Sequence, residues 1–375
     1  MAPPLPPLPS IAETLKHPAF NTAVWQLVPD RSGITPVAQA RGGPIKISWE
    51  IHGSGPRRLV LIMGLGGMKS AWQRQTLYFG HQRGDEYSVL IFDNRGMGQS
   101  DKPLMRYSTS EMARDVAELL AHPDVGWLPG FPLPSDPPSS VPRSLHVVGI
   151  SMGGMIAQEL ACLVPAAIAS LGLICTAAAV ENTTTFSEHM AQRLSLLLPK
   201  TPERSIADAA RRMFSRAWLA SPTDDIELPD PETTPKVLPP KGGGAKYLKF
   251  SSNAERFVAQ EMNKRLDPDS GFTVKGFLLQ LIAAGWHRKT AEQLARMADE
   301  VGRERILVMH GTEDGMISVP HGRKLIEMIR PGKGLIIEGM GHVPAVELRD
   351  FHRVLEDLFA TGERLNGSAM MSGGS

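Results

Sequence analysis

Cysteine is scarce in this chain of 375 residues. Cys162 and Cys175 are the only two, which is too few for a zinc site built on cysteines or for a small domain stapled by disulfides. Both lie in apolar segments, so we expect small buried side chains and neither a disulfide nor a metal pair. An intracellular, reducing compartment follows from this, and the cytoplasm is the predicted location.

The sequence also lacks an excess of charge of either sign. It has 40 Lys and Arg against 39 Asp and Glu, a formal net charge of +1, so we expect neither nucleic acid nor an acidic membrane surface as partner. No apolar run is long enough to cross a bilayer, which predicts no transmembrane segment. The first residues lack the basic stretch and apolar core of a secretory signal. Their prolines predict a flexible, polyproline-like leader over residues 1–30.

A regular alternation of strand and helix signals fills most of the chain. The later strand segments are continuous Val, Ile and Leu runs, as expected for parallel strands buried on both faces. The first two are more polar and closely spaced, which favours an antiparallel edge. This order predicts an α/β fold, with a mostly parallel sheet and helices on both faces. The predicted strands are residues 35–40, 44–52, 58–63, 87–93, 144–150, 169–175, 305–310 and 334–338.

Two segments interrupt the alternation. Residues 123–142 are rich in proline, serine and glycine, and we predict an extended surface loop there. Between 181 and 298 amphipathic helices replace the strands, which predicts a helical cap inserted between two parts of the core, 31–180 and 299–365. Residues 221–244 of the cap are expected to be mobile, and residues 366–375 disordered. The cap helices are predicted at 186–198, 205–219, 254–264 and 274–284.

A Gly-x-Ser-x-Gly motif is the most informative feature of the chain. Ser151 lies between Gly149 and Gly153, directly after an apolar strand and before a predicted helix. Such a turn projects the serine hydroxyl above the end of the sheet, and the glycines leave room for the backbone. Ser151 is therefore the predicted nucleophile. The alternative is a serine that only caps the helix after it.

A serine hydroxyl becomes a good nucleophile when a base accepts its proton and a carboxylate orients that base. Asp314 and His342 follow Ser151 in the chain order Ser, Asp, His, and each comes directly after a predicted strand. Because the carboxyl ends of the strands meet at one edge of the sheet, we expect these three side chains to form a triad. Glu313 is the competing acid. His310 is the competing base, although we expect it to form a structural hydrogen bond at a strand end.

An acyl oxygen that gains charge in the transition state needs two backbone donors. The amide of Met152 is the first candidate because it follows the nucleophile. The second is the amide of Leu65, in the glycine-rich loop after the third predicted strand, where Gly64 and Gly66 permit the backbone path. The alternative is a tight glycine turn without function. The same loop is no phosphate loop, because no Gly-Lys-Ser/Thr follows it.

These motifs, in this order, resemble the α/β-hydrolase superfamily. The resemblance rests on residues 64–67, Asp-x-Arg-Gly-x-Gly-x-Ser at 93–100, 149–153, His-Gly-x-x-Asp at 310–314 and Gly-His at 341–342. It covers residues 45–175 and 305–359 and implies an α/β-hydrolase fold, an eight-stranded sheet and a Ser151–His342–Asp314 triad. The family's usual His-Gly start of the oxyanion loop is Met63-Gly64 here. A serine nucleophile argues against the dehalogenase and epoxide-hydrolase relatives, which use aspartate.

We expect Asp93 and Arg95 to hold the loops beneath the site, with contact to the substrate as the alternative. The predicted function is a serine hydrolase that cleaves a carboxylic ester, with a small, apolar ester or acyl substrate and no metal or organic cofactor. The alternatives are an acyltransferase or thioesterase, a carbon–carbon bond hydrolase, and a ligand receptor. The apolar cap side chains could line an acyl pocket or form the cap's own core, and they are Met213, Phe214, Trp218, Leu219, Phe277, Leu278, Leu281 and Ile282.

Overall fold

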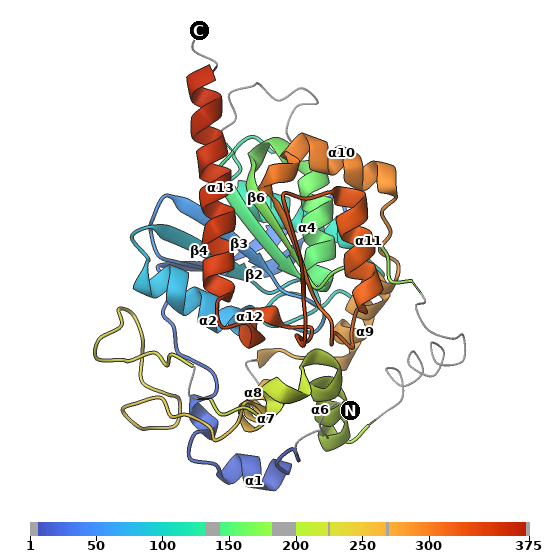
Figure 1. The fold of residues 1–375 in the computed structure, drawn as a ribbon. Helices are drawn as coiled ribbons and strands as arrows, with labels where there is room; N and C mark the ends of the chain where they lie inside the picture. Colours follow the sequence, from blue (N-terminus) through green and yellow to red (C-terminus); the bar gives the residue numbers. More distant parts are fainter. Residues whose placement is uncertain (1–6, 132–142, 182–199, 224–225, 268–269, 373–375) are drawn as a thin grey trace.

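The computed structural model describes residues 7–131, 143–181, 200–223, 226–267 and 270–372. At its centre is an eight-stranded sheet in the order β1-β2-β4-β3-β5-β6-β7-β8 (Figure 1). Strand β2 runs antiparallel to β1 and β4, and the other neighbours are parallel. The predicted α/β fold, a mostly parallel sheet with an antiparallel edge, is confirmed.

All eight predicted strands are present, with ends that differ by a few residues. The sheet comprises β1 (Arg31–Val37), β2 (Ile45–His52), β3 (Arg57–Ile62), β4 (Tyr87–Phe92), β5 (Leu145–Ile150), β6 (Ile168–Ile174), β7 (Ile306–Gly311) and β8 (Lys333–Ile337). Side chains on β3 alternate between its faces: Val60 and Ile62 belong to one buried cluster, Leu59 and Leu61 to another. This alternation follows from the two-residue period of a strand. Both faces therefore need a covering layer.

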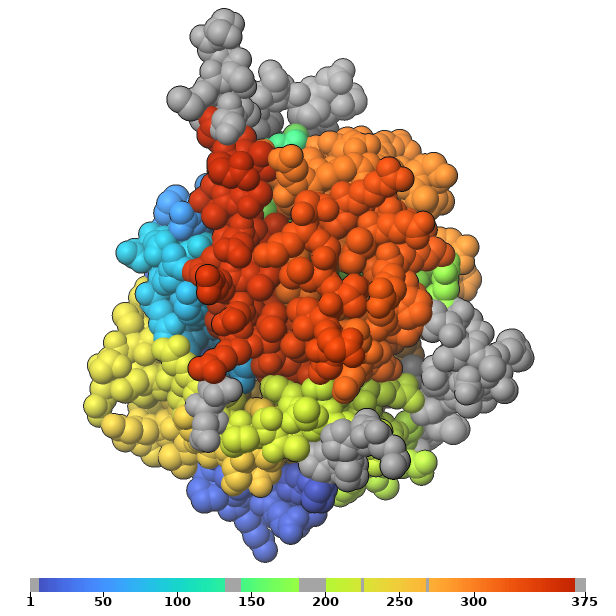
Figure 2. Space-filling model, viewed as in Figure 1, coloured from blue at the N-terminus to red at the C-terminus, as the bar shows by residue number. Residues whose placement is uncertain are grey.

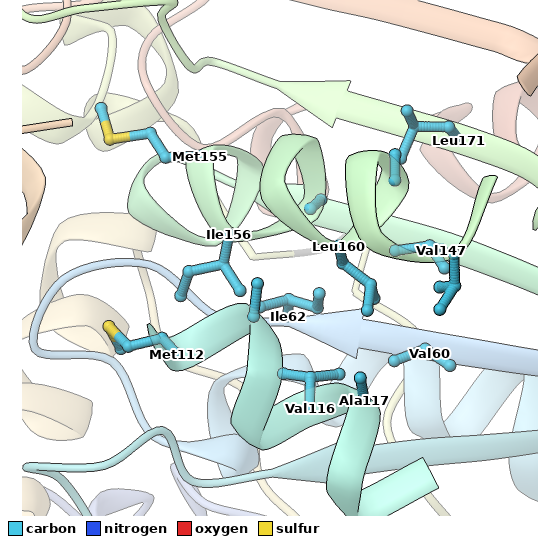
Figure 3. Packing of buried hydrophobic residues seen from close by; sticks show 14 of the residues in the cluster. Val60, Ile62, Met112, Val116, Ala117, Val147, Met155, Ile156, Leu160 and Leu171 are labelled. Carbon is cyan, nitrogen blue, oxygen red and sulfur yellow. The ribbon is translucent and has the colours of Figure 1, made fainter. Parts of the chain in front are cut away.

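Helices supply that layer on each face. One face is covered by α3 (Thr109–Ala121), α4 (Met152–Leu163), α10 (Ala291–Val301) and α11 (Val319–Ile329). Figure 3 shows Met112 and Val116 of α3 and Ile156 and Leu160 of α4 packing over Ile62 and its neighbours in the sheet. The other face is covered by α13 (Phe351–Ser372) and by the segment η2 (Lys69–Trp72), α2 (Gln73–Gln75) and η3 (Thr76–Gln82). Short turns complete this core: η4 (Pro165–Ala167), η6 (Arg303–Arg305) and α12 (Pro344–Glu347).

The helices of the predicted cap lie beyond one end of the sheet (Figures 1 and 2). The described ones are α6 (Pro202–Met213), α7 (Arg216–Ala220), α8 (Asn253–Leu266) and α9 (Val274–Gly285). The predicted helix at 205–219 is two helices, because Phe214 adopts an extended conformation and Ser215 caps α7. The helix predicted at 186–198 lies outside the described residues.

The predicted cap boundary at residue 298 is wrong. Helix α10 buries Leu294, Met297, Ala298 and Val301 in the core beside α4 and α11. Its apolar stripe faces the sheet and packs in the same cluster as the other helices of that face. The cap therefore ends before α10. Residues 221–244 were expected to be mobile, but Ile226 and Val237 are buried with Trp25 and Leu77.

Both ends of the chain are more ordered than predicted. Residues 7–30 are no flexible leader: α1 (Ile11–Lys16) begins with a Ser10–Glu13 capping box and packs against α8, and η1 (Phe20–Thr22) follows. Ile11 and Phe20 join the apolar cluster of the cap. At the other end α13 continues to Ser372, so residues 366–372 are helical and only 373–375 lie outside the described chain.

The predicted surface loop at 123–142 is partly internal. Trp127 and Leu128 are buried in the core, and residues 132–142 lie outside the described chain. Both cysteines are free, Cys175 buried and Cys162 half-buried. None of the helices in the described ranges is both long and apolar enough to span a membrane.

Candidate active site

Ser151 stands on a strained turn between β5 and α4. Its φ is 58° and its ψ is −125°, a backbone conformation that residues other than glycine rarely adopt. The flanking glycines are required by close contacts: a Cβ at Gly149 would lie 2.2 Å from the Gly153 carbonyl oxygen, and one at Gly153 would lie 2.1 Å from the Ile62 oxygen. The Ser151 side chain makes no capping hydrogen bond to α4. A helix cap therefore does not explain this serine.

Asp314 and His342 form a hydrogen-bonded pair. His342 Nδ1 donates to Asp314 Oδ2 at 2.7 Å, and both side chains are buried. The other carboxylate oxygen, Oδ1, accepts the amides of Met316 and Ile317 at 2.8 and 2.9 Å. Because Nδ1 is engaged by the carboxylate, Nε2 is the nitrogen of His342 left for the cavity that this residue lines with Ser151.

Several groups keep the Asp314 carboxyl ionised. Burial alone would raise its pKa, but the charge of His342 and hydrogen bonds from His310 and His342 outweigh burial, so the pKa lies well below its ordinary value. An ionised Asp314 holds the proton of His342 on Nδ1 and stabilises the imidazolium that forms when Nε2 takes a proton.

The two competing residues are placed elsewhere. Glu313 is exposed, next to the buried Asp314. His310 is fully buried and donates from Nε2 to the Ile317 carbonyl at 2.7 Å, with Asp314 Oδ2 at 3.2 Å from the same nitrogen. It thus forms the structural hydrogen bond expected for it and supports the turn that carries Asp314.

The glycine-rich loop after β3 lies against Ser151. A Cβ at Gly64 would lie 2.9 Å from the Ser151 Cβ and 3.5 Å from its Oγ, so only glycine allows this approach. Among the described residues no acceptor takes the amide hydrogen of Leu65 or of Met152. Both predicted donors are therefore available to an oxygen bound beside Ser151.

Gln280 of α9 is a residue that sequence reasoning missed. It is fully buried, its Oε1 accepts the Gly66 amide at 2.9 Å and its Nε2 donates to the Arg95 carbonyl at 2.9 Å. The side chain thus joins the cap to two loops of the core. A single amide in the apolar run of α9 was the available signal, because a buried polar group needs partners.

Glu347 of α12 was also missed, and nothing in its sequence context marks it. Its Oε2 accepts the amide of Gly341, next to His342, at 3.2 Å and the amide of Ser215 in the cap at 3.1 Å. Its Oε1 is buried without a partner among the described residues. Burial raises the pKa of this carboxyl to about 6, against the hydrogen bonds that lower it.

Helix α6 contacts both loops of the Asp–His pair. The Met213 carbonyl accepts the amide of His342 at 2.7 Å, and the Arg212 carbonyl accepts the amide of Gly315 at 2.9 Å. These carbonyls belong to the last turn of α6, where helical partners are missing. The cap therefore helps to set the position of His342 and of the loop that carries Asp314.

Beneath the site, Asp93 and Arg95 anchor loops as expected. Asp93 accepts the Lys69 amide at 2.8 Å and its Nζ at 3.1 Å. Arg95 is buried and pairs with Asp115 through two contacts of 2.5 Å. Arg95 lies outside the cavity lining, whereas Asp93 contributes to its floor.

A cavity of about 980 Å³ connects these elements between the core and the cap. Ser151, His342 and the 64–67 loop lie on its wall, and Asp314 lies behind His342. Of the cap residues named from the sequence, Met213, Phe214, Phe277 and Leu278 line it. Trp218 and Leu219 instead pack in the cap's own core, and Ile282 is exposed. Some of these apolar side chains therefore line the cavity, and others form the cap's own core.

One group of side chains in the described residues has the spacing of metal ligands: Cys175, Asp314 and His342, with ligand atoms within 4.8 Å of one another. Asp314 and His342 are bonded to each other, and burial raises the pKa of the Cys175 thiol well above its ordinary value. A protonated thiol is a poor ligand, since thiolate binds metals. This grouping follows from the packing of the Asp–His pair.

Residues 51–356 match the alpha/beta hydrolase family. The RutD protein of Azorhizobium caulinodans, which carries the provisional name carbamate hydrolase, is 28% identical over 183 residues, 48% of this chain and 59% of its own length. The 3-oxoadipate enol-lactonase 2 of Acinetobacter baylyi is 33% identical over 107 residues, 28% of this chain and 32% of its own. The chain thus spans about a third to three fifths of the length of these relatives.

Solved structures show the same fold. A thermophilic esterase from Thermogutta terrifontis superimposes with a TM-score of 0.60 at 17% identity, covering 90% of this chain and 99% of that one. A meta-cleavage product hydrolase from Pseudomonas fluorescens gives 0.59 at 15% identity, covering 89% and 98%.

Proposed function

This chain belongs to the alpha/beta hydrolase family, and from that premise we propose that it is a serine hydrolase that cleaves carboxylic esters through an acyl-enzyme on Ser151. One observation carries the proposal: His342 is hydrogen-bonded at 2.7 Å to the buried Asp314 and shares a cavity with a serine on a strained turn. An esterase among the structural neighbours and an enol-lactonase among the relatives support the same chemistry.

The reaction has two halves. His342 Nε2 accepts the Ser151 proton while Oγ forms a bond to the acyl carbon, and the amides of Leu65 and Met152 stabilise the oxyanion. The carbon–oxygen bond to the alcohol then breaks, and the alcohol leaves with the proton from His342. Water enters, gives a proton to His342 and attacks the acyl carbon. The bond between that carbon and Oγ then breaks, the acid leaves, and His342 returns the proton to Oγ, which restores Ser151.

Labelling by a fluorophosphonate probe tests the nucleophile. We expect mass spectrometry to find one phosphonylated residue, Ser151, and to find none in Ser151→Ala. Ser70→Ala is the matched control, because Ser70 lines the same cavity on a neighbouring turn; it should label like the wild type. Folded wild-type protein that stays unlabelled would contradict the proposal.

Turnover of para-nitrophenyl esters of graded acyl length tests the reaction. Repeated turnover to the free acid supports ester hydrolysis. The same assay with added methanol separates two fates of the acyl-enzyme, because transfer gives the methyl ester and hydrolysis gives the acid. Methyl ester as the main product at low methanol would assign the chain to acyl transfer instead.

A further inference from the structure

Two arginines on the cavity wall have no counter-charge among the described residues. Arg256 of α8 is 5% exposed, and Arg74 of α2 is partly buried. Arg256 Nη1 and Arg74 Nε are buried and have no hydrogen-bond partner among the described residues. A guanidinium keeps its charge at any physiological pH, and an unpaired buried charge is costly. Folding alone gives no reason to keep two of them here.

The carboxylates nearby are already used. Among the described residues that line the cavity, eight are Lys or Arg and five are Asp or Glu. Each of the five acids is paired with a cation other than Arg256 and Arg74: Glu50 and Asp93 share Lys69, Asp208 pairs with Lys200, Glu261 with Lys264 and Arg265, and Asp267 with Lys241. The cavity therefore has a positive excess, and Arg256 and Arg74 are part of it.

The two guanidinium groups are held in place by contacts that leave charge uncompensated. Arg256 Cζ lies 5.3 Å from the centre of the Trp25 ring, which orients the guanidinium plane. Arg74 Nη1 donates to the Val346 carbonyl at 2.7 Å. Both arginines line the same cavity, and Trp25 links them: its amide donates to Gln73, the neighbour of Arg74, at 2.9 Å, and its ring lies against Arg256. Burial and then the repulsion from Arg74 lower the pKa of Arg256. An anion between them would relieve this repulsion.

We propose that Arg256 and Arg74 form an anion-binding subsite of the active-site cavity, which binds a carboxylate that the substrate carries apart from its ester. The planar fork of a guanidinium matches a carboxylate through paired hydrogen bonds. The cavity volume of about 980 Å³ falls in the range of small-molecule sites. Its apolar wall of Met213, Phe277 and Leu278 suits the hydrocarbon chain between the ester and the carboxylate of the substrate. This inference rests on the proposed function and names its substrate class, the monoesters of dicarboxylic acids.

A pair of substrates tests the subsite. Mono-para-nitrophenyl glutarate carries a carboxylate at the end of its acyl chain, and para-nitrophenyl hexanoate is its neutral counterpart of similar length. We expect Arg256→Met to lower kcat/KM for the glutarate about 10- to 100-fold, the range for loss of a charged hydrogen bond, with less than about threefold change for the hexanoate. Arg74→Met should act in the same direction, and Arg256→Lys should retain part of the preference.

Arg211→Gln is the matched control for a lost charge. Arg211 lies on α6 of the cap with 59% of its side chain exposed and lies outside the cavity lining, so both esters should react as with the wild type. Arg256→Met should also leave Tm equal or higher, because it removes an unpaired buried charge. Equal losses with both esters, or a lower Tm with no change in preference, would overturn the subsite.

Binding without chemistry separates this proposal from the one it rests on. In Ser151→Ala, calorimetry should show glutarate binding that is lost in Ser151→Ala/Arg256→Met. If no ester turns over but this binding depends on Arg256, the proposed function fails and the subsite stands. If esters turn over and glutarate binds equally in both variants, the subsite fails alone. Arg256-dependent binding of inorganic phosphate without glutarate binding would contradict a carboxylate ligand.

Discussion

At the residue scale, burial decides which of two adjacent acids can orient His342. Asp314 and Glu313 are neighbours, and both follow a strand that ends at the correct edge of the sheet. Only Asp314 points inward, where it accepts hydrogen bonds from His342 and from two backbone amides. The direction of the side chain therefore distinguishes Asp314 from Glu313.

Exchanging each acid for its amide separates the two. Asp314→Asn should lower kcat by about a thousandfold to ten-thousandfold, because an amide cannot hold the proton of His342 on Nδ1. Glu313→Gln should change kcat by no more than about twofold, as expected for an exposed position. Steady-state kinetics with one para-nitrophenyl ester measures both. Equal effects of the two changes would contradict the assignment of Asp314.

At the scale of elements, the catalytic loops are held by the cap as well as by the sheet. The last turn of α6 accepts the amides of His342 and Gly315, and Glu347 of α12 bridges the amides of Gly341 and Ser215. A displacement of α6 or α7 would therefore alter the position of His342 directly.

Glu347 gives this bridge a pH dependence. Its pKa of about 6 in the folded protein lies above its ordinary value of 4.5, so the folded state binds more protons than the unfolded state between these values. The free energy of unfolding should therefore fall as pH rises from 4.5 through 6, by about 2 kcal/mol from this group. Glu347→Gln should lack this loss and be the more stable protein above pH 7 by a similar amount.

Urea denaturation of wild type and Glu347→Gln across this pH range measures the difference. The amide oxygen can still accept the two backbone amides, so the comparison isolates the charge. The two proteins should converge below pH 4.5, where the carboxyl is protonated in both states. Parallel stability curves over the whole range would rule out the proposed role of ionisation.

At the scale of the whole molecule, the N-terminal segment joins the core to the cap. The Ala23 carbonyl accepts Gln73 Nε2 from the core and Gln260 Nε2 from α8, each at 3.2 Å. Gln73 Oε1 also accepts the Trp25 amide at 2.9 Å. Ala23 and Trp25, in the segment predicted as a leader, therefore link the core to the cap beside the arginine subsite.

Gln73→Leu should destabilise the protein by about 2 kcal/mol, because it leaves the buried Trp25 amide without its acceptor. Calorimetry at a fixed scan rate should show a lower Tm. Gln82→Ala is the control: its hydrogen bond to Glu227 is exposed, so its loss should leave Tm nearly unchanged. A Tm for Gln73→Leu equal to that of the control would show that this link contributes nothing.

Much of the molecule could be predicted from its sequence. The later strands are apolar runs bounded by turn residues, and helix α3 begins at Thr109 after the N-cap Ser108, which forms a capping box with Glu111. The chain order Ser151, Asp314, His342 follows from motifs at strand ends. The wrong expectations concern contacts between residues distant in sequence. The amphipathic pattern of α10 is the same for a cap helix and for a core helix, and only its packing shows that it belongs to the core. The prolines near the start favoured a flexible leader, whereas residues 11–16 form a helix that packs against α8.

The sequence by itself determined the strands, their mostly parallel arrangement and the candidates for the triad, because these depend on hydrophobic period and on motifs of a few adjacent residues. Only the tertiary structure decided which acid is buried, how the cap holds the loop of His342, and that Arg74 and Arg256 line one cavity with no counter-charge in the described part of the chain. Those features depend on contacts between residues far apart in the sequence, such as Met213 with His342. The sequence around either arginine does not indicate that the other lines the same cavity, and the proposed carboxylate subsite depends on that shared position.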